Sequence, residues 1–385
     1  MIKTSILATG ITTVVFGIAM TLPVAAQKEA LRALYDSAAT ISTNVEGVRA
    51  YPAPPMGFDP VAASDEELAA YGISVRPDKA LDPDGYRRWL KMAMVMSNPR
   101  NRWYGLLEPR PVRTSPQALM RTAGSSTTFG PTSVQGPSWS GVVDTLPGTT
   151  FSSTASFASV QGEFAVPVPQ EAFAPGGGNI CDGGTDRASF WVGLGGLTVT
   201  GTNLGKQNNL AQSGVDIHVE CGATNGHGAY AWVEWYPGVN VRLFDVNPGD
   251  DIQVSVRCNS ATGGSFSITD FTQQKSAGYA ISAPNGFQLV GNEADFIVER
   301  PSGDAKTPKG YYPLANYIWS FWDFSRATTF NGTHYYPGGT TASTYDISMT
   351  DDSAVNVISV PSIDKGLQNL FVSDEGCAYT GGCTP

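Results

Sequence analysis

The sequence predicts an all-β protein: an antiparallel β-sandwich of two curved, concanavalin-like sheets, preceded by a small and mainly helical N-terminal region. Two observations predict this class. Glycine (43 residues) and proline (26) are spread along the 385-residue chain, as a fold with many turns requires. Beyond Trp139, short runs of alternating apolar and polar residues are separated by clusters of Gly, Pro, Asn and Asp. Hydrophobic residues make up 41% of the chain, which is enough for a packed core and excludes a disordered protein.

The first 26 residues have the pattern of a secretion signal. Lys3 is followed by an apolar stretch over 6–22 and by small residues over 24–26. This order of basic, apolar and small residues is typical of a signal peptide. We therefore predict a signal peptide over 1–26 and a secreted protein, extracellular or periplasmic, that has no membrane attachment after cleavage.

The helical signals lie in the next region, 27–130. A capping box begins at Ser64, and residues 82–96 have helical spacing. The basic stripe of the second helix consists of Arg87, Arg88 and Lys91. Residues 122–138 are rich in Ser, Thr and Gly, which predicts a linker to the following domain.

Charge separates the same two parts of the chain. Residues 27–130 contain 13 basic and 11 acidic residues, whereas residues 131–385 contain 10 and 23. Because surfaces of opposite charge attract, we predict that 27–130 is a propeptide that docks on the domain 131–385. The whole chain has a net charge of −10, so it offers no broad basic surface and we expect no nucleic-acid partner.

Strand alternation assigns side chains to two faces of the predicted sheet, since successive residues of a strand point to opposite sides. The runs 190–195, 211–220, 229–236 and 294–299 each have one largely apolar face that is expected to point into the core. The opposite, non-core face carries Trp191, Gln212, Gly214, Asp216, His218, Glu220, Tyr230, Trp232, Glu234, Tyr236, Asp295, Ile297 and Glu299. This outward face is therefore expected to present aromatic rings, carboxylates and a glutamine together.

Several familiar hydrolase motifs are missing from the sequence. It has three histidines, none in a Ser/His/Asp or Cys/His pattern, and it has no HExxH, GxSxG or CxxC motif and no phosphate-binding glycine loop. Serine, cysteine and zinc hydrolase mechanisms are thus unsupported, and we expect no cofactor or metal.

Seven sequence blocks occur in a recognisable order. They are WSGVV at 139–143, Val160 to Pro167, FWVGLGG at 190–196, AQSGVDI at 211–217, YAWVEWYPG at 230–238, GDDIQVSV at 249–256 and EADFIVERP at 293–301. In this order and spacing they resemble the blocks of the glutamic peptidases (eqolisins), over roughly 139–358. The resemblance implies a glutamic peptidase β-sandwich domain over 131–385.

The resemblance also implies site residues. The catalytic glutamine of the family falls on Gln212, and its catalytic glutamate falls on Glu299, the second acid of its block. The residues expected to bind substrate or to support this pair are Trp191, Glu234, Trp232 and Tyr236. Two positions depart from the fungal pattern, because Gly195 and Tyr230 each stand where the fungal blocks have an aspartate.

These residue types support the mechanism that the resemblance implies. An ionised Glu299 would take a proton from the attacking water and later give it to the leaving amine, while Gln212 would stabilise the oxyanion without titrating. A glutamate of ordinary pKa, about 4.3, does this work best in acid. We expect a pepstatin-insensitive acid endopeptidase that acts on polypeptides as a monomer.

Two other functions remain open from the sequence. A non-catalytic, lectin-like sandwich could bind sugar on the aromatic face, and it would need neither Gln212 nor Glu299. A glycosidase could use Glu234 and Glu299 as its pair of carboxylates without needing Gln212.

Five cysteines in an exported chain suggest disulfides with one thiol left over. Their positions favour two pairs and a free cysteine, although other pairings remain open. The favoured set is Cys181 with Cys221, Cys377 with Cys383, and Cys258 free.

Overall fold

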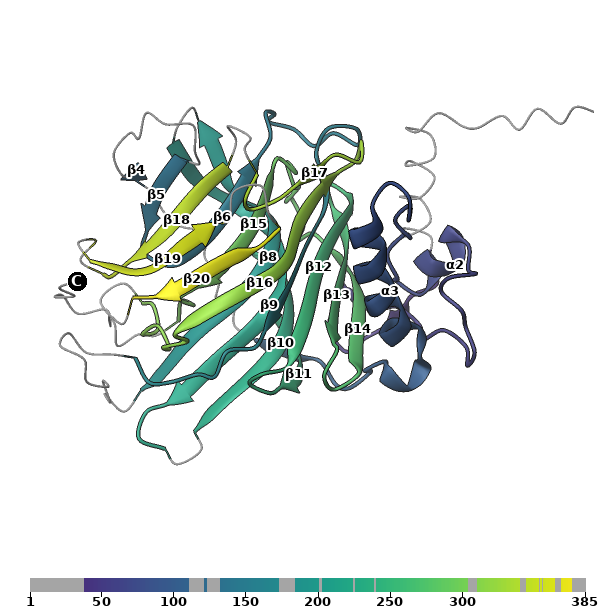
Figure 1. Ribbon diagram of the computed structural model, residues 1–385, viewed down its shortest axis with the longest axis horizontal. Helices are drawn as coiled ribbons and strands as arrows, with labels where there is room; N and C mark the ends of the chain where they lie inside the picture. Colours follow the sequence, from purple (N-terminus) through teal and green to yellow (C-terminus); the bar gives the residue numbers. More distant parts are fainter. Residues whose placement is uncertain are drawn as a thin grey trace, which may run out of the picture.

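The computed structural model consists of two layers of strands, with helices packed at one side (Figure 1). It describes residues 38–110, 121–122, 132–172, 184–200, 203–223, 226–238, 240–303, 310–339, 344–352, 354, 356–363 and 368–375. The predicted signal peptide, 1–26, lies outside these residues. In the described part of the chain, no helix is long and apolar enough to cross a membrane.

One layer, called the front layer below, carries the blocks that hold the predicted site. Its strands are antiparallel neighbours, except that β5 and β18 run parallel. In spatial order they are β3 (Glu108–Arg110), β11 (Asn240–Val246), β10 (His227–Tyr236), β9 (Asn203–Glu220), β8 (Thr185–Thr200), β15 (Glu293–Glu299), β6 (Trp139–Thr145), β18 (Thr344–Thr350), β5 (Thr132–Gly136) and β4 (Arg121–Thr122).

The other layer, called the back layer, is also antiparallel. Its order is β1 (Ile41–Ser42), β2 (Val48–Ala50), β14 (Lys275–Ser282), β13 (Gly263–Asp270), β12 (Asp251–Ser260), β7 (Phe157–Ala165), β16 (Trp319–Thr329), β20 (Leu370–Asp374) and β19 (Val357–Ile363). The short β17 (His334–Tyr335) pairs with one end of β16. Strand β19 also pairs with β18, so the two layers are joined along one side.

The main hydrophobic core fills the space between the layers. Phe190, Val215 and Phe296 enter it from the front layer, on the face that strand alternation predicts. From the back layer, Phe164 approaches Phe190 with 6.0 Å between ring centroids. The predicted all-β sandwich is therefore confirmed, together with the predicted assignment of core-facing residues.

The opposite face of the front layer, called the site face below, is buried as well. Asp295, Ile297 and Glu299 share this face, as predicted, but the expectation that they point outward is wrong, because each is at most 1% exposed. A second apolar cluster covers the face. Its described members are Val134, Trp139, Val143, Trp191, Leu197, Leu210, Tyr230, Trp232, Ile297, Tyr345 and Ile347.

The predicted helices of the N-terminal region are present. Helix α2 (Asp65–Ala70) begins with the predicted capping box, in which the Ser64 side chain accepts a hydrogen bond from Glu67 N and Glu67 accepts one from Ser64 N. Helix α3 (Pro83–Ser97) is capped by Asp82 and is followed by the 3₁₀ turn η1 (Pro99–Asn101). Apolar residues of α3, including Trp89 and Met96, pack with Phe271 at the β13–β14 turn.

The linker predicted over 122–138 is wrong for part of its length. Residues 132–136 form β5, which pairs in parallel with β18 and buries Val134 in the second apolar cluster. The Thr and Val residues of this segment fit a strand, because β-branched side chains pack well on a pleated surface. Residues 123–131 lie outside the described part of the chain.

The N-terminal region also supplies outer strands to both layers. In the back layer β2 pairs with β14 and has β1 on its outer side; in the front layer β3 pairs with β11 at one edge and β4 pairs with β5 at the other. Strands β2 and β3 are the ones that pair with β14 and β11. In both pairs the strand from the N-terminal region is three residues long. Backbone donors and acceptors of β11 and β14 that would otherwise face solvent are thereby paired.

Of the cysteines, Cys258 is a free, buried thiol, as predicted, and burial raises its pKa. Cys221 is disulfide-bonded, and its partner lies outside the described residues. The proposed pairing of Cys221 with Cys181, and that of Cys377 with Cys383, stay predictions.

Three carboxyl groups are buried near one another where β6 and β15 meet. Burial raises the pKa of Asp144 to about 7 and that of Glu293 to about 8. Burial, followed by the neighbouring Glu293 and Asp144 carboxylates, also raises the pKa of Asp295. Asp144 accepts a hydrogen bond from Thr344, and Glu293 accepts one from Leu197 N, which opposes the effect of burial in each case. The fold therefore holds these groups protonated in acid.

This cluster predicts that part of the folding stability is lost as pH rises. The unfolded chain releases these protons near pH 4, whereas the folded chain keeps them until about pH 7 to 8, so the free energy of unfolding falls across this window. Glu293→Gln, which cannot titrate, should make that decline shallower. Urea unfolding at intervals from pH 4.5 to 8 would measure it, with the exposed Glu220→Gln as the matched control. An equal slope for wild type and Glu293→Gln would contradict the assignment.

Candidate active site

Register between strands arranges the site face in three rows that cross β15, β8, β9 and β10. One polar row contains Glu299, Ser189, Asp216 and Tyr230, each opposite the next. A middle row contains Ile297, Trp191, Gly214 and Trp232. A second polar row runs through Gly193, Gln212 and Glu234 to Asn240 on β11. The predicted glutamine and glutamate thus lie on one face, in rows on either side of the tryptophans.

Glu299 lies in a buried setting beside the indoles of Trp139 and Trp191. Its carboxyl oxygen accepts a hydrogen bond from the indole Nε1 of Trp191 at 2.8 Å. Burial raises the pKa of Glu299 well above its ordinary value, and the indoles of Trp139 and Trp191 partly oppose the shift. The nearby carboxylates of Glu234 and Asp216 raise it further. Glu299 is therefore neutral in acid as long as the face stays covered.

Gln212 is held by a buried carboxylate. Its Nε2 donates to Oε2 of Glu234 at 2.8 Å, and Nδ2 of Asn240 donates to the same oxygen at 3.3 Å. Both Gln212 and Glu234 are fully buried. Because a hydrogen bond to a carboxylate is stronger than one between neutral groups, Glu234 fixes the orientation of the Gln212 amide.

Three tryptophans line the site face: Trp191 and Trp232 in the middle row, and Trp139 opposite Glu299 at the end of the first polar row. Trp139 of β6 meets Trp191 edge to face, with 5.0 Å between centroids and 77° between ring planes. Gly214 makes room for Trp191, since a Cβ at this position would come within 2.6 Å of the Trp191 Cβ. Trp232 is buried in the same cluster, and Tyr236 packs against it at its rim. All six predicted site residues therefore lie on the site face.

A further polar group beside Glu299 was not singled out from the sequence. Asp216 accepts hydrogen bonds from the hydroxyls of Ser189 and Tyr230, the latter at 2.6 Å. The guanidinium of Arg242 lies 4.7 Å from the centre of the Tyr230 ring. Strand alternation had put Asp216 and Tyr230 on this face, but their contact depends on strand pairing that the sequence alone did not specify.

The two departures from the fungal blocks have local structural reasons. Gly195 has φ +90° beside a bulge between β8 and β9, and a Cβ there would lie 2.6 Å from the carbonyl oxygen of Asn209. This backbone therefore has no place for an aspartate side chain. Tyr230 places a hydroxyl where the fungal blocks have a carboxyl group, and this hydroxyl donates a hydrogen bond to Asp216.

The site face is closed to a polypeptide in this structure. Gln212, Glu234, Glu299 and Trp191 are each at most 1% exposed, so a polypeptide cannot reach them in this arrangement. Strand β4, paired with β5 on one side, also approaches β9. Among the described residues, no group of three or more His, Cys, Asp or Glu side chains is placed to hold a metal ion.

Comparisons with known proteins match the same part of the chain. Aspergillopepsin-2 of Aspergillus niger is 30% identical over 167 residues, which cover 43% of this chain and 51% of that protein. Scytalidopepsin B of Scytalidium lignicola is 32% identical over 121 residues, covering 30% of this chain and 41% of that protein. The chain therefore spans about half, or less, of the length of these curated relatives.

Solved structures of similar proteins include scytalido-glutamic peptidase with a peptide-based transition-state analogue. It has 18% identity and a TM-score of 0.46, covering 62% of this chain and 98% of that chain. The aspergilloglutamic peptidase of Aspergillus niger has 23% identity and a TM-score of 0.39, covering 49% of this chain and 99% of that chain. A sequence model of the peptidase A4 family matches residues 137–365, more than half of the chain and all six predicted site residues. The protein therefore belongs to the peptidase A4 family, the glutamic peptidases or eqolisins.

Proposed function

We propose that the protein is a secreted acid endopeptidase that hydrolyses peptide bonds with Glu299 and Gln212. The observation that carries the proposal is their arrangement on the site face. Glu299 is hydrogen-bonded to Trp191, and Gln212 is hydrogen-bonded to Glu234, a carboxylate close enough to raise the pKa of Glu299. An amide and a carboxyl group held rigidly on one face of a sheet suit a reaction in which water attacks a carbonyl.

In this mechanism Glu299 first acts as the base. Its ionised carboxylate takes a proton from a water molecule, and the oxygen of that water attacks the scissile carbonyl carbon. The Gln212 amide donates to the oxyanion of the tetrahedral intermediate, an interaction typically worth about 3 to 4 kcal/mol. Protonated Glu299 then gives its proton to the leaving amine, and the C–N bond breaks. The Trp191 N–H stabilises the carboxylate form of Glu299 before the first step and after the last.

Closure of the site face prevents this reaction for two separate reasons. A polypeptide cannot reach Glu299, and burial keeps the pKa of its carboxyl group so high that it stays protonated in acid. Contact with water removes the desolvation that raises the pKa, so the pKa falls toward its ordinary value of about 4.3. Opening of the face therefore supplies both access and a proton acceptor.

Substitution of the pair tests the mechanism. Glu299→Gln removes the proton acceptor and should eliminate peptidase activity, while the isosteric amide keeps the fold. Gln212→Ala should lower kcat by roughly a hundredfold to a thousandfold, as loss of an oxyanion donor does. Activity would be measured on denatured protein between pH 3 and 5 with pepstatin present. Near-normal turnover by either purified variant would exclude its residue from the reaction.

Glu234→Gln separates a peptidase from a glycosidase. In the peptidase Glu234 only orients Gln212, and an amide can still accept a hydrogen bond there, so part of the activity should remain. A glycosidase that used Glu234 as a catalytic carboxylate would release reducing sugar as wild type. It would lose all of this activity in the Glu234→Gln variant.

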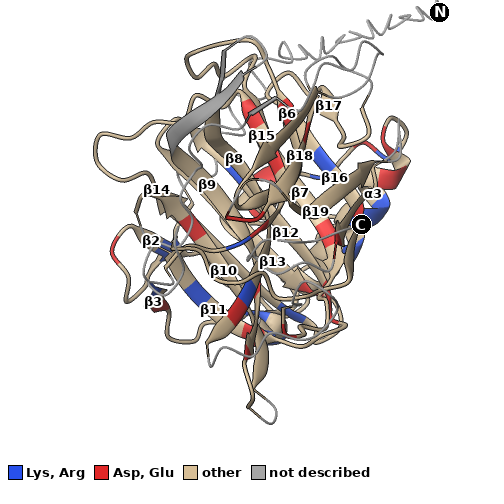
Figure 2. Ribbon diagram, turned by 90° about the vertical axis from the view of Figure 1, so that its left-hand side faces the viewer, with Lys and Arg blue, Asp and Glu red and all other residues tan. Residues whose placement is uncertain are grey.

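We further propose that 27–130 is a propeptide held in place by ion pairs. On α3, Arg88 contacts Glu163 at 3.1 Å and also contacts Asp323, while Lys91 contacts Glu163 and Asp251 at 2.7 Å each. The basic residues of α3 lie beside strands of the back layer (Figure 2). Arg87, the third residue of the predicted basic stripe, pairs with Asp84 of its own helix.

Acid should weaken this attachment. Protonation of Glu163, which both cations contact, removes a negative charge, whereas Arg88 and Lys91 stay charged. Burial raises the pKa of Glu163, whereas the contacts with Lys91 and Arg88 lower it. The attraction of these two cations for Glu163 is present while its carboxyl group is ionised and is lost once it is protonated, so acid removes this part of the docking energy.

Charge removal on α3 tests this release. The double variant Arg88→Gln/Lys91→Gln should lose residues 27 to about 130 and gain activity faster than wild type at pH 4, and should begin to do so at higher pH. Arg87→Gln, whose side chain is 77% exposed and paired within the helix, is the matched control. Mass spectrometry and activity would be followed over time at pH 4 and pH 7. A chain that stays uncut and is fully active from the first time point would overturn the propeptide.

A further inference from the structure

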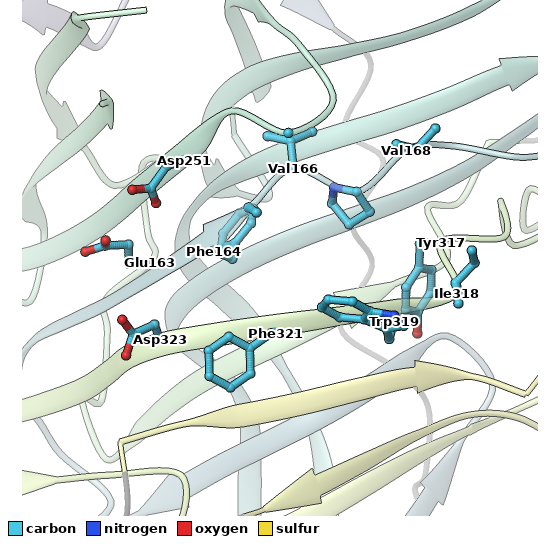
Figure 3. Close-up of a pocket in the computed structure, with 13 residues that line it drawn as sticks. Glu163, Phe164, Val166, Val168, Asp251, Tyr317, Ile318, Trp319, Phe321 and Asp323 are labelled. Carbon is cyan, nitrogen blue, oxygen red and sulfur yellow. The ribbon is translucent and has the colours of Figure 1, made fainter. Parts of the chain in front are cut away.

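A groove crosses the back layer, on the opposite layer from the site face. Its volume is about 540 Å³, and its walls are residues 164–168, at the end of β7, and residues 317–321, at the start of β16. Glu163, Asp251 and Asp323 gather at one end, while Val168, Ile318 and Trp319 lie at the other (Figure 3). The groove therefore has an acidic end and an apolar end.

The apolar end gathers the exposed large apolar side chains of the sandwich. In the described residues from 132 onward, the exposed ones are Val168, Ile318, Trp319, Phe321 and Phe371. Phe371 of β20 stacks on Trp319 with 5.3 Å between ring centroids. Soluble monomers rarely leave a large contiguous apolar patch uncovered unless the patch binds something.

The backbone at Ile318 is strained, and its side chain is exposed at the apolar end of the groove. Ile318 has φ +59°, a left-handed conformation that β-branched residues adopt at a cost of about 1–3 kcal/mol. Hydrogen bonds hold it there, from Ile318 N to Asn316 Oδ1 at 2.8 Å and from Asp374 N to Ile318 O at 3.0 Å. The strained side chain is nevertheless 54% exposed, so the core does not account for it.

The acidic end has capacity left for another cation. Arg88 and Lys91 contact the same oxygen of Glu163, Oε1. The other oxygen, Oε2, is buried and has no hydrogen-bond donor among the described residues. Asp251 and Asp323 remain about two-fifths exposed. The contacts with α3 show that basic side chains fit this end, and three carboxylates facing two cations leave one negative charge.

We propose that the groove is a second binding site for polypeptide substrates, one that takes an extended segment with a basic residue next to aromatic or large apolar residues. The basic residue lies at the Glu163 end, and the apolar residues lie on Trp319, Phe321 and Ile318. The proposal rests on the proposed function, because it assigns the segment to a substrate.

Binding of two labelled peptides to the full-length chain tests the groove. The probes are fluorescein-labelled Gly-Ser-Arg-Trp-Leu-Ser-Gly and the same peptide with Gln in place of Arg. Fluorescence anisotropy at pH 5 would use Glu299→Gln protein, which cannot hydrolyse the probe and reports binding even if the proposed peptidase function fails. The Arg probe should bind at least tenfold more tightly than the Gln probe. Because exposed charges are screened by salt, the difference should shrink as NaCl rises from about 50 to 300 mM.

Two groove variants and one control locate the binding. Trp319→Ala/Phe321→Ala should weaken binding of the Arg probe at least tenfold, while the exposed Glu220→Gln should leave it unchanged. Ile318→Gly should also weaken it without lowering the melting temperature, since glycine adopts a positive φ freely. This second variant tests the groove even if the double variant folds poorly.

Three results would overturn the proposal. The first is equal affinity for the two probes, and the second is unchanged binding in a folded groove variant. The third is a concentration-dependent dimer in sedimentation, abolished by Trp319→Ala/Phe321→Ala and accompanied by no probe binding. That result would assign the groove to self-association.

Discussion

The Trp191–Glu299 hydrogen bond depends on a sheet that is buried on both faces. One face of the front layer forms the sandwich core, so polar residues can occupy only the other, and there the second apolar cluster removes them from water. The Trp191 indole N–H is then one of the few polar partners of the Glu299 carboxyl group. Every electrostatic property of the site follows from this setting, because low polarity strengthens the few contacts present and penalises free charge.

The N-terminal region contacts both layers, and it does so with different kinds of interaction. Helix α3 is held on the back layer by ion pairs, which acid weakens, and by apolar packing against Phe271, whereas β2 and β3 are held by backbone hydrogen bonds that acid leaves intact. Loss of the ion pairs alone therefore loosens the region without detaching it completely. The strands β2 and β3 are short, so few backbone hydrogen bonds hold the N-terminal region in place after α3 has dissociated.

Strand alternation predicted the fold class, the core face and the face of all six site residues. Side chains alternate between the two faces within each strand, so this assignment does not require the order of the strands in the sheet. The burial of that face was not predicted. Asp295 and Glu299 are acidic residues on the non-core face, so alternation alone places them toward solvent, and it does not reveal the second apolar cluster on that face. The row that brings Ser189, Asp216 and Tyr230 to Glu299 depends on register between strands far apart in sequence. Residues 132–136 were predicted to form part of a linker. Their partner, β18, runs parallel to them and lies about two hundred residues further along the chain, so no neighbouring segment indicates the pairing.

The paired edges have a consequence for the protein once 27–130 has gone. Removal of β2, β3 and β4 would uncover hydrogen-bonding groups on β14 of the back layer and on β11 and β5 of the front layer. Open edges invite strand addition between molecules and so promote aggregation. Lys275, at the start of β14, and Arg242, within β11, place positive charges along these edges. In acid both stay charged, so repulsion between copies would keep the processed molecules apart under the conditions that create them.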